Sequence, residues 1–123
     1  MTARRINVSS GSAFEAEAGY SRAVRVGPLV VVAGTTAPGD DVATQAREAF
    51  RRIEIALAEA GAALTDVIRT RMFVTDIAQW REVAAVHEEI FGAVRPVSTM
   101  VEVSALIGPD LQIEIEADAY VAD

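Results

Sequence analysis

The C-terminal segment 111–121 alternates between apolar and polar side chains, and no other pattern in the chain constrains the fold as strongly. One set of alternate positions is apolar and the other is acidic or aromatic: Ile113, Ile115, Ala117, Ala119 and Val121 against Glu114, Glu116, Asp118 and Tyr120. Because successive side chains of a β-strand point to opposite faces, this period of two predicts a strand from Leu111 to Val121. Its apolar face needs a packing partner, so the chain has to build a layered structure around a sheet.

The partners of this strand are predicted from the remaining segments. Apolar residues recur at steps of three and four in one of them: Val42, Ala46, Ala49, Phe50, Ile53, Leu57 and Ala60. This spacing predicts a helix over 42–60 that stops at Gly61, and Asp76 is a predicted N-cap for a second helix running through Phe91. Runs of β-branched and aromatic residues predict strands over Ala23–Val26, Leu29–Gly34, Val67–Val74 and Thr99–Val103, the first two joined as a hairpin at Gly27-Pro28.

This order of elements predicts an α+β fold in which two helices pack on one face of a mixed β-sheet. With 123 residues, of which 51% are hydrophobic and 24% charged, the chain reads as a single globular domain over 1–123. The segment Leu29–Val32 carries apolar groups on both sides, and too little chain remains to cover the second face. We therefore expect that face to be buried against other subunits.

Composition excludes several classes of chemistry. The chain has no Lys and no Cys, and His87 is its one histidine, so lysine Schiff bases, thiolate nucleophiles, and cysteine or multi-histidine metal sites are ruled out. We expect no metal and no cofactor. A net charge of −7 disfavours nucleic acid as a partner. The longest apolar run is too short to span a bilayer and no secretory signal follows Met1, so we expect a cytoplasmic protein without a membrane partner.

The acidic side of the last strand offers candidate acid–base groups. Glu114, Glu116 and Asp118 lie on one face, roughly 7 Å apart. Such a row is usually a solvated face. Alternatively, one of these carboxylates becomes enclosed at a subunit contact, where loss of water raises its pKa and suits it to general acid–base catalysis.

Two further kinds of residue are open to both a structural and a functional interpretation. His87 lies on the apolar stripe of the second predicted helix, either as a core histidine or as a pocket group. Thr35 and Ser98 lie at strand ends, where hydroxyls cap turns or contact substrates held by a rigid sheet.

Several segments, taken together and in order, carry a family resemblance. They are GYS at 19–21, AGT at 33–35, TQA at 44–46, RTRMFVTD at 69–76, RPVSTMVEV at 95–103 and QIEIEA at 112–117. Together they resemble the reactive-intermediate deaminase family, also called the Rid/YjgF or L-PSP family, over Gly19 to Val121. The resemblance implies a chorismate-mutase-like α+β fold assembled as a homotrimer with clefts between subunits. It also implies hydrolysis of reactive enamines and imines without metal or cofactor.

The resemblance also assigns site residues. Tyr20 matches the pocket tyrosine, Glu114 matches the carboxylate that positions or activates the attacking water, and Thr35 occupies the cleft-facing position after glycine. Family deaminases hold the substrate carboxylate with an arginine two residues after the proline, where this chain has Ser98. Met100 of the same motif joins the expected substrate-binding set, and so does His87, which stands where an aromatic residue is frequent.

A serine supplies neither the charge nor the paired geometry of a guanidinium, so amino-acid-derived imines are not the expected substrates. The first hypothesis is therefore a Rid-type hydrolase acting on a small imine or enamine without the usual carboxylate, with Glu114 handling the proton and the water. The alternative is a trimer that binds a small metabolite without turnover, as a sensor or regulator. Whether Arg95 replaces the missing arginine stays open, and a nuclease role is disfavoured by the acidic charge.

Overall fold

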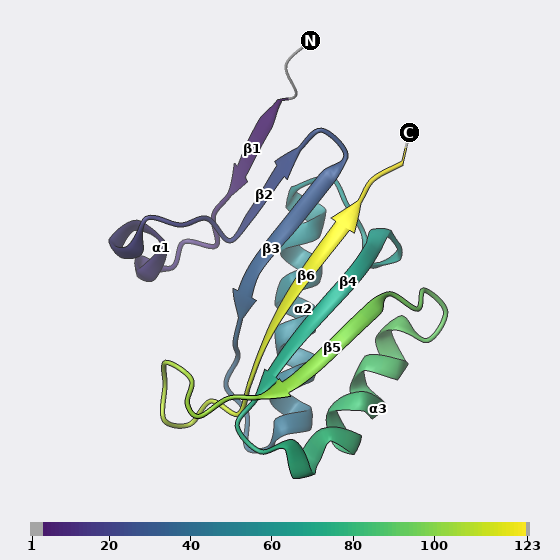
Figure 1. Ribbon diagram of the computed structural model, residues 1–123. Helices are drawn as coiled ribbons and strands as arrows, with labels where there is room; N and C mark the ends of the chain where they lie inside the picture. Colours follow the sequence, from purple (N-terminus) through teal and green to yellow (C-terminus); the bar gives the residue numbers. More distant parts are fainter. Residues whose placement is uncertain (1–3, 123) are drawn as a thin grey trace.

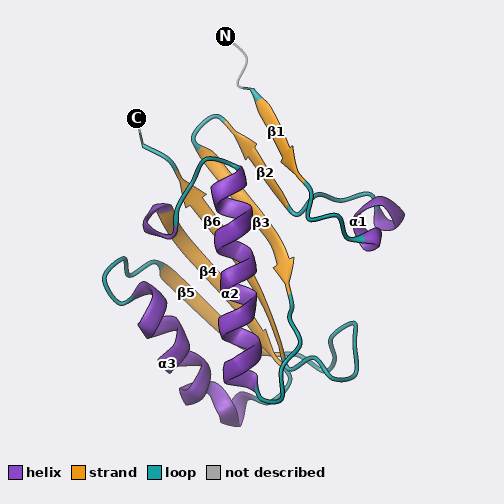
Figure 2. Ribbon diagram, turned by 180° about the vertical axis from the view of Figure 1, so that it is seen from behind, coloured by secondary structure: helices purple, strands orange, loops and turns teal. Residues whose placement is uncertain are grey.

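The computed structural model describes residues 4–122, which form one six-stranded sheet with two long helices behind it (Figures 1 and 2). The strands are β1 (Arg5–Val8), β2 (Ala23–Val26), β3 (Leu29–Thr35), β4 (Val67–Val74), β5 (Val97–Glu102) and β6 (Ile113–Tyr120). The helices are α1 (Ala13–Ala18), α2 (Val42–Glu59) and α3 (Trp80–Phe91), with short 3-10 turns at Leu64–Asp66 and Ile77–Gln79. The predicted α+β fold with two helices on one face of a mixed sheet is confirmed.

The sheet is mixed because one strand pair differs from the others. The strand order is β1-β2-β3-β6-β4-β5. β4 and β5 are parallel, and the other neighbours are antiparallel. The return from β4 to β5 passes through α3, as a parallel connection requires.

β6 occupies the middle of the sheet and follows the predicted alternation. Ile113, Ile115, Ala117 and Ala119 are buried under the helices, whereas Glu114, Glu116 and Asp118 point to the other face. Arg71 of β4 lies 3.6 Å from Glu116 and 3.4 Å from Asp118, so part of the acidic row is neutralised across the strands.

α2 begins where the sequence predicts and buries the expected stripe. The Asp41 side chain accepts a hydrogen bond from the Thr44 amide as N-cap, and Gly61 follows the helix with a φ of +82°. Asp76, by contrast, caps the 3-10 turn that precedes α3, so the helix itself starts later, at Trp80. Trp80 is 43% exposed and does not belong to the buried stripe. No helix in residues 4–122 is long and apolar enough to cross a membrane.

The N-terminal part adds two elements that the sequence analysis did not predict. β1 pairs with β2 at the edge of the sheet, and α1 lies to one side of it (Figure 1). Most residues of both elements are exposed, so neither shows a clear hydrophobic period. Glu15 of α1 is nevertheless buried, and it contacts the candidate site described below.

No helix of residues 4–122 covers the face of the sheet opposite α2 and α3 (Figure 1). Leu29, Val31, Val101 and Tyr120 on this face are all exposed. Burial of this face by other subunits stays a prediction.

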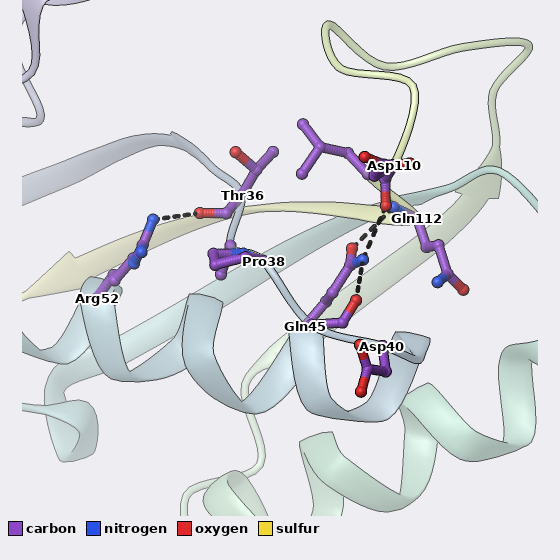
Figure 3. Close-up of a pocket in the computed structure, with 10 residues that line it drawn as sticks. Thr36, Pro38, Asp40, Gln45, Arg52, Asp110 and Gln112 are labelled. Atoms are coloured by element: carbon purple, nitrogen blue, oxygen red, sulfur yellow. Dashed lines mark hydrogen bonds between the residues drawn. The ribbon is translucent and has the colours of Figure 1, made fainter.

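Gln45 ties the loop after β3 to the loop before β6 (Figure 3). Its Nε2 donates hydrogen bonds to the carbonyl oxygens of Gly39 at 3.0 Å and Asp110 at 2.9 Å. Its Oε1 accepts one from the Gln112 amide at 2.8 Å. The side chain is fully buried and its polar atoms are satisfied.

Replacing Gln45 with Leu is expected to lower the free energy of unfolding by about 2–4 kcal/mol, because backbone groups in both loops lose their partners. Urea denaturation followed by circular dichroism measures this loss. Glu54→Leu, on the exposed side of the same helix, is the matched control and should change stability little. Equal effects of the two substitutions would contradict the assigned role of Gln45.

Candidate functional site

The first group of predicted site residues gathers around a residue that the sequence analysis missed, Arg22. One guanidinium nitrogen, Nη1, donates to the Gly34 carbonyl oxygen and to Thr35 Oγ1, both at 2.9 Å. Nη2 donates to the Tyr20 hydroxyl at 3.4 Å. Arg22 therefore fixes the loop that carries Tyr20 against the end of β3. In the sequence, the one feature that pointed to Arg22 as a site residue is that it directly follows the GYS motif at 19–21.

Arg22 is itself held by Glu15. Both Ser9 and Ser10 donate hydrogen bonds to the Glu15 carboxylate, through their hydroxyls and the Ser10 amide. These bonds, that from the Ser10 hydroxyl above all, hold the pKa of Glu15 below its ordinary value. An ionised Glu15 oxygen lies 3.9 Å from Nε of Arg22, so α1 helps to orient the guanidinium.

Glu114 lies against Gly34, on the face of the sheet that the helices leave open. A Cβ at position 34 would overlap the Oε2 of Glu114, so a side chain there would displace the carboxylate from this position. Thr35 is 2% exposed, and its hydroxyl accepts from Arg22 and donates to the Ala33 carbonyl oxygen at 2.8 Å. The buried Thr35 side chain thus holds the end of β3 in place through these hydrogen bonds, whereas Tyr20 is exposed.

Burial raises the pKa of Glu114, and the nearby charge of Glu116 raises it further. The positive charge of Arg22 acts in the opposite direction. A carboxyl whose pKa moves toward neutrality exchanges protons more readily near neutral pH, which is the property required of a general acid–base group.

The second group of predicted residues lines an open hollow of about 600 Å³ between α3 and β5. His87, Ser98 and Met100 all lie in its wall, together with Met72, Phe91 and Pro96. His87 Nε2 is 2.8 Å from Thr70 Oγ1, which in turn donates to Ser98 Oγ at 2.8 Å. Thr70 is fully buried and was not predicted, because its strand pattern alone does not distinguish a packed threonine from a hydrogen-bonding one.

Arg95 lines the same hollow as Ser98. Its φ of +59° places it in the left-handed region, which is uncommon for a residue with a side chain. Within residues 4–122 its guanidinium forms no ion pair. A charged group therefore stands beside the hollow, three residues before Ser98.

One chain does not bring the two groups together. Ser98 pairs with Thr70, and both side chains turn toward the helices, whereas Glu114 pairs with Phe73 and points to the opposite face. A second hollow, of about 570 Å³, lies beside Gln45 and contains none of the predicted site residues (Figure 3). In the described part of the chain, no cluster of three or more His, Asp or Glu side chains could hold a metal ion.

The raised pKa of Glu114 predicts how stability depends on pH. The folded state binds the Glu114 proton more tightly than the unfolded state, so the free energy of unfolding falls as the pH rises above 4.5 and through the folded-state pKa. Glu114→Gln removes this loss. Relative to the wild type, the variant should be more stable at about pH 8 than at about pH 4, as measured by urea denaturation.

Glu54→Gln, at an exposed position, should follow the wild type across the same pH range. If Glu114→Gln and the wild type differ by the same amount at both pH values, the Glu114 carboxyl is not enclosed as described.

Comparison with known proteins agrees with the resemblance in the motifs. The sequence profile of the family described as Endoribonuclease L-PSP matches residues 10–121. A crystal structure of Rv2704 from Mycobacterium tuberculosis, a member of the YjgF/YER057c/UK114 family, is 68% identical, with a TM-score of 0.95, and the match covers 96% of this chain and 100% of that one.

Curated relatives are more distant. A protein of Streptomyces coelicolor is 38% identical over 92% of this chain and 90% of its own length. The 2-iminobutanoate/2-iminopropanoate deaminase of Salmonella typhimurium is 33% identical over 81% of this chain and 85% of its own length. With the matched profile spanning nearly the whole fold, the chain belongs to the Rid/YjgF/L-PSP family.

Proposed function

We propose that the protein is a cofactor-independent hydrolase that converts a small imine or enamine into a carbonyl compound and ammonia. The observation that carries this proposal is the half-buried carboxylate of Glu114, whose pKa is raised by burial and which lies in the space left by the missing side chain of Gly34. The relatives named as 2-iminobutanoate/2-iminopropanoate deaminases support the reaction class.

The proposed reaction needs one proton-transferring group. Ionised Glu114 takes a proton from water as the water oxygen adds to the carbon of the C=N bond. Glu114 passes this proton to the nitrogen, which gives a neutral carbinolamine. Glu114 then takes the proton of the carbinolamine hydroxyl as the C=O bond forms and delivers it to the nitrogen, which leaves as ammonia as the C–N bond breaks. One imine and one water thus give one carbonyl compound and one ammonia, and Glu114 ends as it began.

We further propose that the reaction takes place between subunits of a homotrimer. Glu114 lies on the open face of the sheet, Tyr20 is exposed in the loop before β2, and the hollow beside Ser98 lies on the helix side of the β5 edge. A second copy can place its hollow against the open face of the first. The exposed apolar side chains on that face supply a surface for such contact.

The substrate in this proposal lacks the carboxylate of amino-acid-derived imines, because Ser98 replaces the arginine of the family deaminases. No specific observation favours the alternative, a trimer that binds a metabolite without turnover. Cleavage of RNA, which the family description mentions, would require a protein of net charge −7 to bind a polyanion.

The assembly is tested by light scattering at micromolar concentration, where we expect three times the 13.1 kDa mass of the chain. Val31→Arg, on the open face, should shift the mass toward the monomer, because a buried unpaired charge opposes association. Ile55→Arg is the matched control, since Ile55 is an aliphatic residue on α2 that is 45% exposed, against 39% for Val31. A wild-type monomer would contradict the assembly and the cleft.

The substrate class is tested by ammonia release from 2-iminobutanoate and from its uncharged amide. The wild type should prefer the amide, and Ser98→Arg should raise kcat/KM for 2-iminobutanoate by roughly ten- to a hundredfold, the effect of adding a charge-assisted hydrogen bond. Adding Glu114→Gln should abolish this gain. Efficient hydrolysis of 2-iminobutanoate by the wild type would instead assign the carboxylate to another group, Arg95 first.

A further inference from the structure

We propose that His87, Thr70 and Ser98 form a hydrogen-bonded relay that presents the Ser98 hydroxyl as a donor to an uncharged carbonyl or imine in the hollow beside β5. This inference rests on the proposed function and specifies how the substrate is recognised. The relay crosses from α3 through β4 to β5, so its members are far apart in the sequence and meet only in the fold.

The number of protons available links the direction of the relay to the tautomer of His87. In the proposed relay, Thr70 gives its one hydroxyl proton to Ser98 Oγ at 2.8 Å. The 2.8 Å contact between Thr70 and His87 then uses a proton on Nε2 of the imidazole, so the proposal specifies the Nε2-protonated tautomer. Within residues 4–122 the Ser98 hydroxyl makes no other side-chain hydrogen bond, so its own proton is free to meet a ligand in the hollow.

The surroundings of His87 keep this relay uncharged. Its ring packs between Phe50 and Phe91, at centroid distances of 5.8 Å and 4.9 Å. Burial lowers the pKa of His87, so near neutral pH the imidazole carries one proton. The ionisable groups that share the hollow are Glu88 of the same helix and Arg95 of the following loop, and His87 forms no ion pair with either within residues 4–122.

The wall of the hollow fits an uncharged ligand. Apolar contacts come from Met72, Phe91, Pro96 and Met100. On the β5 side, the Ser98 hydroxyl is a hydrogen-bonding group. A neutral donor binds a carbonyl oxygen or an imine nitrogen by one hydrogen bond, whereas a carboxylate needs a matching charge. The lining carries one such charge, on Arg95, together with the opposing negative charge of Glu88. The relay therefore selects for ligands of the first kind.

Binding is tested on the full chain by NMR titration with 2-oxobutanamide and 2-oxobutanoate, which differ mainly in charge. The amide should bind more tightly than the acid. Ser98→Ala and Thr70→Val should each weaken amide binding by about five- to tenfold, the effect of losing one hydrogen bond. The double variant should lose no more than either single variant, because both substitutions interrupt the same relay.

The matched control is Thr99→Val, which removes a hydroxyl from the same strand at a position that faces away from the hollow. It should leave amide binding unchanged. Thr70 is buried, so His87→Phe serves as a second way to break the relay if Thr70→Val does not fold. The imidazole ¹⁵N shifts of the wild type should report a neutral ring protonated at Nε2.

Tighter binding of 2-oxobutanoate, lost on Arg95→Gln, would overturn the inference and make Arg95 the ligand anchor. The inference would also be overturned if both Thr70→Val and His87→Phe bound the amide as tightly as the wild type does. If the relay variants weaken amide binding but no imine is hydrolysed, the inference stands and the proposed function fails. If imines are hydrolysed and the relay variants bind normally, the function stands and the inference fails.

Discussion

The register of β6 is the constraint on which the rest of this structure depends. Its apolar side chains pack against α2. Its carboxylates occupy the opposite face of the sheet because side chains alternate strictly along a strand. A shift by one residue against β3 and β4 would bury Glu114, Glu116 and Asp118 under the helices and expose Ile113 and Ile115. The free energy lost by burying several unpaired carboxylates is far larger than the free energy gained by pairing one strand. The alternation that fixes the core therefore also fixes the position of Glu114 against Gly34.

Strong periodicity explains which parts of the fold could be predicted from the sequence. Segment 67–74 and the helix from Val42 were placed correctly because each has a face that must be buried. β1 and α1 were missed because their stability comes from pairing with β2 and from the contacts of Glu15, which leave no period in the sequence. In the candidate site, the motifs and the side-chain types led us to propose Glu114, Ser98 and His87 as site residues. Arg22 and Thr70 were not proposed, since their hydrogen bonds depend on partners in other elements.

The sheet lies between Glu114, the candidate acid–base group, and the hollow beside Ser98. Glu114 points away from the helices, and Ser98 points toward them, so no rotation of side chains within one chain can bring both to a single small molecule. Acid–base catalysis requires heavy atoms within hydrogen-bond reach of the reacting group. A hydrolase that used both Glu114 and Ser98 on one substrate would therefore have to draw them from two copies of the chain.

Enclosure between subunits would have opposite consequences for a guanidinium and for the relay of His87, Thr70 and Ser98. An arginine in a closed cleft requires an anionic ligand, because a buried unpaired charge is strongly unfavourable. The relay carries no net charge while His87 is neutral, and its buried member, Thr70, already has hydrogen-bond partners on both sides. Closing the cleft thus removes water that competes for the Ser98 hydroxyl without isolating a charge, and a hydrogen bond in such surroundings is stronger than in water. In such a cleft, a serine at position 98 would therefore favour an uncharged ligand, whereas an arginine would favour an anionic one.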